Sequence, residues 1–64
     1  MDINTAFKIY RSPGGHSGQD IAAAIDYFSE RAHTADTDAQ ADEWNVLARV
    51  LMRTWADRFE IDHC

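Results

Sequence analysis

The sequence predicts an all-α protein: a shorter and a longer helix form a helical hairpin behind a short N-terminal arm, and a second copy completes a dimeric helical bundle. The only proline and all three glycines fall within residues 11–19, so the strongest helix breakers are absent from the rest of the chain. Apolar residues recur at helical spacing in two segments beyond that stretch. A chain of 64 residues forms a single domain and buries only about 60% of its unfolded surface, so a partner should help to cover it.

The N-terminal arm, residues 1–11, fits two periodicities. As a helix it would place Ile3, Phe7 and Tyr10 on one face, whereas as a strand it would turn Phe7 and Ile9 to the same side. β-Branched and aromatic residues beside a Pro-Gly-Gly turn favour the strand, but the helical character of the remaining chain favours a helix. Both interpretations stay open.

The first helix is expected over residues 18–33, after a connector at residues 12–17 that should be a turn or a mobile linker. Ser17 has the position of an N-cap, and Asp20 follows it at the spacing of a capping box. The apolar stripe of this helix consists of Ile21, Ala24, Ile25, Phe28 and Ala32.

The second helix is expected over residues 38–61 and carries the strongest periodic signal. Thr37 and Gln40 form a capping box at its start. Its apolar ladder consists of Ala41, Trp44, Ala48, Leu51, Trp55 and Phe59. Because this helix is roughly 35 Å long and the first only about 24 Å, the first cannot cover it. We expect a second copy of the chain to cover the remainder, ahead of a different protein and the folded-back arm.

Acidic residues crowd the start of the second helix. They are Asp36, Asp38, Asp42 and Glu43. Carboxylates are favoured at the positive end of a helix by about 0.3–1 kcal/mol each, but one or two suffice and four repel one another. An EF-hand calcium loop is excluded, because Ala41 and Leu47 occupy the positions that require glycine and glutamate. The surplus charge predicts a surface for a partner.

The residue patterns predict no enzyme, no cofactor and no bound metal. Glu30 and His33 have the Glu-x-x-His spacing of di-iron bundles, but the further glutamates that such a site requires lie on the polar side of the second helix. The adjacent Asp, His and Cys of residues 62–64 fit a frayed terminus better than a zinc site. Residues 14–18 lack the lysine of a P-loop and fit a flexible linker.

The chain has a formal net charge of −5, from 11 acidic and 6 basic residues, which opposes attraction to nucleic acid. Its one cysteine, Cys64, cannot form an intramolecular disulfide and fits a reducing compartment. No apolar run approaches the roughly 20 residues of a membrane span, and the first residues lack a signal-peptide pattern. We therefore expect a cytoplasmic protein without a membrane partner.

These observations predict a small acidic module, an adaptor or inhibitor of the kind that phages and plasmids encode, which binds another protein. Either the acids imitate nucleic-acid charge and dock on the basic groove of a nucleic-acid-processing enzyme, or the aromatic stripe is the anchor. The expected partner-binding residues are Asp36, Asp38, Asp42, Glu43, Trp44 and Trp55.

The alternative is a dimeric nucleic-acid-binding regulator, either similar to ribbon-helix-helix repressors or an RNA-binding helical bundle. Arg49 and Arg53 lie one turn apart on the polar face of the second helix, and Arg31 and Lys8 could extend a basic strip. If residues 1–11 form a strand, the order strand, helix, helix matches the repressors. The acidic residues of the same face count against this function.

Overall fold

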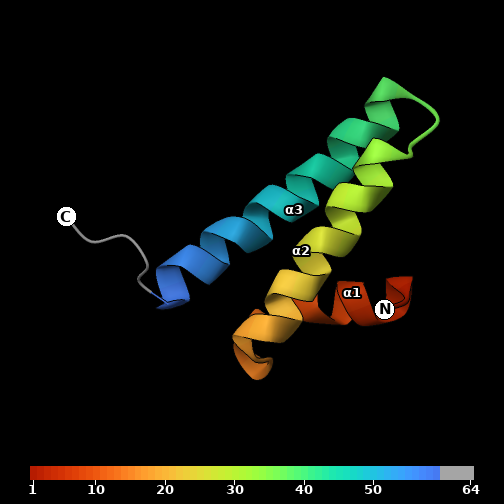
Figure 1. Ribbon diagram of the computed structural model, residues 1–64. Coiled ribbons are helices and arrows are strands. Elements are labelled where there is room, and N and C mark those ends of the chain that lie inside the picture. The colour runs from red at the N-terminus through yellow and green to blue at the C-terminus, as the bar shows by residue number, and fades with distance from the viewer. Residues whose placement is uncertain (60–64) are drawn as a thin grey trace.

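The structure, a computed structural model, describes the backbone of residues 1–59 and the side chains of residues 1–57. Its elements in chain order are the helix α1 (Ile3–Arg11), the 3₁₀ turn η1 (Pro13–Gly15), and the helices α2 (Gly18–His33) and α3 (Asp38–Phe59). Helices α2 and α3 form a hairpin that closes at residues 34–37, and α1 packs against α2 (Figure 1). The described residues are therefore all-helical, as predicted, with the arm forming a third helix.

Helix α1 settles the ambiguity of the N-terminal arm in favour of the helix. The carboxylate of Asp2 caps it by accepting a hydrogen bond from the backbone N–H of Thr5 at 2.9 Å. The Thr5 hydroxyl and this N–H lower the pKa of Asp2 below its ordinary value of 3.8, because both favour the charged form. The cap is therefore complete above that value and is lost as the pH falls through the lowered pKa.

The starts of α2 and α3 confirm the two predicted caps. Ser17 Oγ accepts a hydrogen bond from the backbone N–H of Asp20 at 3.2 Å, and Thr37 Oγ1 accepts one from Gln40 at 3.1 Å. Helix α2 has the predicted bounds, and α3 begins at the predicted residue. The predicted end of the second helix, at residue 61, lies outside the described residues.

We expect Thr37→Ala to lower the free energy of unfolding by about 1 kcal/mol, because it leaves a backbone N–H of the first turn of α3 without its acceptor. Thr37→Ser keeps the hydroxyl and should cost much less. Urea melts followed by circular dichroism compare the two variants. Equal midpoints for both would show that the hydroxyl does not stabilise this helix start.

Phe28 is the centre of the core. It is fully buried, and four aromatic rings, those of Phe7, Tyr10, Tyr27 and Trp44, lie with centroids 5.4–6.2 Å from its own. Such aromatic pairs add about 0.5–1.5 kcal/mol each beyond the burial of their area. The other buried residues are Ala6, Ile9, Ile21, Ala24, Ala48 and Leu51.

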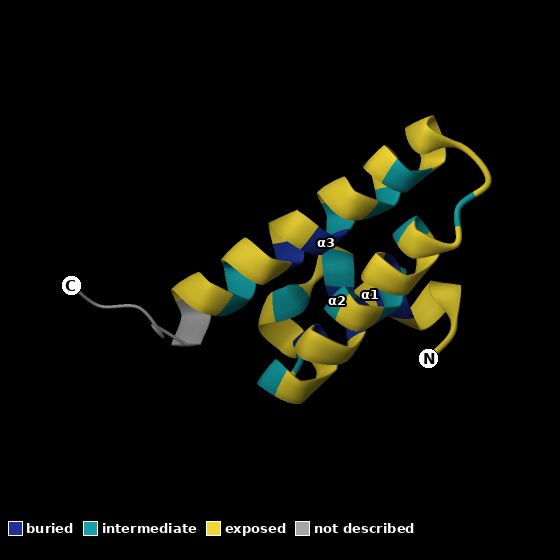
Figure 2. Cartoon of the chain, turned by 45° about the horizontal axis from the view of Figure 1, so that its top comes forward, coloured by how far each residue is buried: buried dark blue, intermediate teal, exposed yellow. Residues whose placement is uncertain are grey.

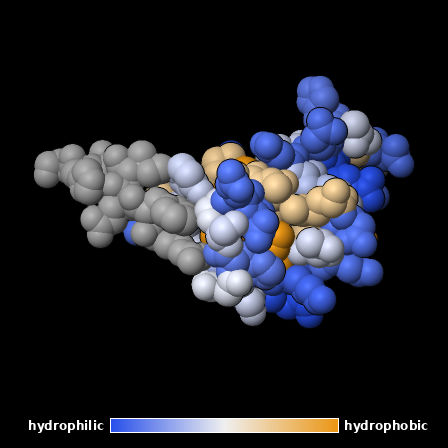
Figure 3. All heavy atoms as spheres, turned by 60° about the horizontal axis from the view of Figure 1, so that its bottom comes forward, coloured by the Kyte–Doolittle hydropathy of each residue, from blue (hydrophilic) through white to orange (hydrophobic). Residues whose placement is uncertain are grey.

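The described part of the apolar ladder of α3 is largely covered within one chain, and the side chain of Phe59 lies outside the described residues. Ala48 and Leu51 are buried, while Trp44 and Trp55 are partly buried and pack against the same core. Helix α1 contributes Phe7, whose ring centroid lies 6.2 Å from that of Trp44. On the face seen in Figure 3, strongly apolar atoms show only in small areas between hydrophilic ones. The arm, our third choice, thus covers part of the ladder; the dimeric bundle remains a prediction.

Candidate partner-binding site

The tip of the α2–α3 hairpin holds the predicted acidic cluster. We call Asp36, Asp38, Asp42 and Glu43 the acidic tip; all four side chains are exposed. Asp36 and Glu43 border a hollow of about 330 Å³ between the end of α2 and the start of α3, together with Trp44 and the basic residue Arg31. Asp38 and Asp42 do not line it and lie one turn apart on α3. The hollow therefore brings together three of the six predicted partner-binding residues.

The carboxylates of the acidic tip form no ion pair within the described part of the chain. None of them has a Lys, Arg or His nitrogen at ion-pair distance among the described side chains, where His16 and Asp20 form an ion pair with 3.7 Å between Nδ1 and Oδ2. Asp38 and Asp42 repel each other at the i,i+4 spacing. The favourable field of the helix N-terminus falls off within one turn, so it cannot offset all four charges.

Arg31 lies beside the acidic tip, held by two aromatic rings. Its guanidinium carbon lies 5.7 Å from the ring centroid of Tyr27 and 5.7 Å from that of Trp44. Two cation–π contacts at an exposed site contribute about 0.5–1 kcal/mol each. Sequence reasoning missed this arrangement, although the i,i+4 spacing of Tyr27 and Arg31 was a signal for the first contact.

The two tryptophans do not form one binding surface. Trp44 stacks on Phe28 with a centroid distance of 5.8 Å and an interplanar angle of 22°, and Trp55 packs against the core 11 residues further along α3. That spacing corresponds to roughly 16 Å along the helix axis. Only the exposed part of Trp44 borders the hollow, so the placement of the indoles favours a structural role.

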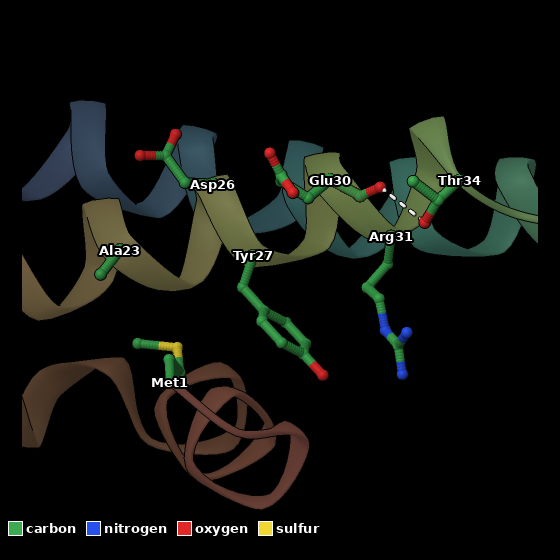
Figure 4. A pocket seen from close by; sticks show the side chains of 7 residues that line it. All are labelled: Met1, Ala23, Asp26, Tyr27, Glu30, Arg31 and Thr34. Atoms are coloured by element: carbon green, nitrogen blue, oxygen red, sulfur yellow. Dashed lines mark hydrogen bonds between the residues drawn. The ribbon is translucent and has the colours of Figure 1, made fainter.

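A second, open groove lies between the start of α1 and the middle of α2. Its volume is about 630 Å³, and its lining consists of Met1, Ala23, Asp26, Tyr27, Glu30, Arg31 and Thr34. Figure 4 shows Tyr27 and Arg31 on the side that faces α1, whereas Asp26 and Glu30 point to the opposite side. The groove therefore does not gather its charged groups around one point.

The residues considered for metal binding do not form a complete ligand set in the described part of the chain. Among the described residues, no three His, Cys, Asp or Glu side chains come together to hold a metal ion. Glu30 and His33 do border one open hollow of about 530 Å³, with Asp26, while residues 62–64 lie outside the described part. None of the helices within residues 1–59 combines the length and apolar character that a bilayer crossing demands.

The basic residues predicted for nucleic-acid binding do not lie on one common face. Arg49 and Arg53 are exposed on α3, on the side opposite the core residue Leu51, whereas Arg31 packs over Trp44. Lys8 is exposed on α1, which is a helix, so the described residues lack the strand with which a ribbon-helix-helix repressor reads DNA.

Comparison with known proteins gives no relative: the chain matches no protein-family model, and neither a curated protein nor a solved structure is significantly similar to it.

Proposed function

We propose that the protein binds another protein through the acidic tip and acts as an adaptor or inhibitor and not as an enzyme. The observation that carries this proposal is the group of four exposed carboxylates without an ion-pair partner among the described side chains. One or two carboxylates suffice at the start of a helix and four repel one another, so the surplus charge supports binding to a partner.

The negative charges of the acidic tip are complementary to a partner protein with a basic surface. Opposite potentials accelerate encounter and select partners, and the effect weakens as salt screens the charges. A nucleic-acid-processing protein carries such a surface where it holds phosphates, so it is the class of partner we favour. The hollow between Asp36 and Glu43 provides a concave feature beside these charges.

The test begins with affinity capture from the native host and identification of the captured protein by mass spectrometry. Asp36→Asn with Asp38→Asn should then weaken its binding at least fivefold, about 1 kcal/mol, and leave the helical circular dichroism unchanged. The matched control is Asp26→Asn with Glu30→Gln, which changes the net charge equally at exposed positions on the outer side of α2.

Two results would contradict the proposal. Equal losses of affinity in both double variants would mean that net charge alone steers binding. Capture of RNA or DNA, with an affinity that falls steeply with salt and depends on Arg49 and Arg53, would favour the nucleic-acid-binding alternative.

A further inference from the structure

The outward side of α3 carries a second periodic stripe, which no described residue covers. Figure 2 shows this side exposed along the helix. We define the outer seam by its six exposed residues: Ala39, Glu43, Val46, Val50, Arg53 and Asp57. Their spacing alternates between four and three residues, which is the heptad spacing of a coiled-coil seam. The core-facing ladder lies on the opposite side of the same helix.

The centre of the outer seam is apolar. Val46 is 55% exposed and Val50 is 44% exposed. Valine is a poorer helix former than the alanine, glutamate or lysine that usually occupy a solvated face, because its branched side chain loses rotamer freedom. Two valines one turn apart at the centre of a heptad stripe therefore indicate a contact that a single chain does not make.

We propose that a second copy of the chain packs antiparallel along the outer seam, with a two-fold axis between Val46 and Val50. Each Val46 then faces Val50 of the partner subunit, and each Glu43 faces Arg53 of the partner subunit, because these residues are equally distant from the axis. Four valines lie between two ion pairs.

The order of charges along the outer seam favours a second copy of the chain as the partner, and an antiparallel orientation of its α3. Glu43 precedes the valines and Arg53 follows them, so only the antiparallel arrangement pairs opposite charges. A parallel arrangement would place Glu43 against Glu43 and Arg53 against Arg53, which is repulsive. A two-fold interface must be complementary to itself, and the outer seam meets that condition.

The same geometry limits the affinity. Arg49 lies beside the outer seam, on the flank that faces Arg49 of the partner subunit, so one like-charge pair opposes association. One helix face against another also contributes less area than the roughly 1,600 Å² of a standard interface. We therefore expect a weak dimer, in the high-micromolar range. The centres of its two acidic tips would lie roughly 25 Å apart along the axis.

The test is sedimentation equilibrium of the full chain from 10 µM to 1 mM. The apparent mass should rise from 7.3 kDa, the mass of one chain, towards twice that value. Arg53→Glu and Glu43→Arg should each weaken the dimer at least tenfold, because each places like charges at both ends of the outer seam. Both positions are exposed, so circular dichroism should show an unchanged helix content.

Mixing the two variants gives the decisive result. A heterodimer of Arg53→Glu with Glu43→Arg contains two attractive pairs again, so the equimolar mixture should associate at least tenfold more tightly than either variant alone. A mass of 7.3 kDa at every concentration would overturn the proposal, as would a dimer that the charge reversals leave unchanged or that mixing fails to restore. Glu43 belongs to both the acidic tip and the outer seam, but Asp36 and Asp38 lie outside the outer seam, so the proposed partner binding, which is tested at these two residues, can fail independently.

Discussion

Phe28→Ala is expected to cost about 3–5 kcal/mol of unfolding free energy. The side chain is fully buried and contacts rings from all three helices, namely Phe7, Tyr27 and Trp44 among others. A core of this size rarely supplies more than about 3–5 kcal/mol in total. The variant should therefore be largely unfolded in buffer at 25 °C, with the helical signal at 222 nm mostly lost.

Two controls separate this packing effect from a general change in α2. Phe28→Leu keeps most of the apolar volume and should remain folded, although less stable than the original chain. Ser29→Ala alters the neighbouring exposed position and should leave the urea midpoint nearly unchanged. If Phe28→Ala melts at the same urea concentration as Ser29→Ala, the aromatic cluster is not the centre of the core.

The helix starts could be read from the sequence because their causes are local. Ser17 and Thr37 each accept a hydrogen bond from an N–H three residues ahead, so a short window contains the whole interaction. The same reasoning could have detected Asp2, which accepts from Thr5 in the same way and would have indicated that the arm begins as a helix.

The role of α1 could not be read from the sequence, because its stabilising contacts are distant along the chain. Phe7 lies 5.4 Å from Phe28 and 6.2 Å from Trp44, measured between ring centroids, and these partners are 21 and 37 residues away in sequence. Periodicity shows which side of a helix is apolar but not what covers it. Because the arm was ambiguous, the sequence did not show what covers the apolar ladder of α3. A second copy of the chain was expected there, where α1 and α2 in fact pack.

The predicted partner site consists of acidic residues, whose surroundings are local in sequence, and of tryptophans, whose surroundings are not. The four acidic residues lie together at the hairpin loop and the first turns of α3, since neighbours in sequence stay neighbours there; their role in binding remains a prediction. The exposure of Trp44 was not predictable, because it depends on Phe7, Phe28 and Arg31 from two other helices. The four carboxylates are therefore accessible to a partner, whereas the two indoles are partly buried.

Ile9→Asp is expected to detach α1 and to destabilise the whole chain by several kcal/mol. Ile9 is 1% exposed, and a carboxylate without a partner in that position loses its hydration. With α1 detached, Trp44 loses its contact with Phe7, so tryptophan fluorescence should shift to the red. The urea midpoint measured by circular dichroism should fall as well, because α1 supplies Ala6 and Ile9, two of the seven residues that are buried among the described side chains.

Matched variants decide whether this loss comes from docking of α1 or from charge. Lys8→Asp changes the charge of the adjacent exposed position and should leave the fluorescence maximum in place, and Ile9→Val should shift the urea midpoint only slightly. If Ile9→Asp shifts the fluorescence to the red but keeps the urea midpoint of Lys8→Asp, the hairpin of α2 and α3 is stable without α1, and the ladder of α3 would then be available to a partner. If neither the fluorescence nor the midpoint changes, Ile9 does not hold α1 in place. A loss confined to Ile9→Asp makes α1 an integral third helix, because the carboxylate then acts through the docking of this helix and not through its charge alone.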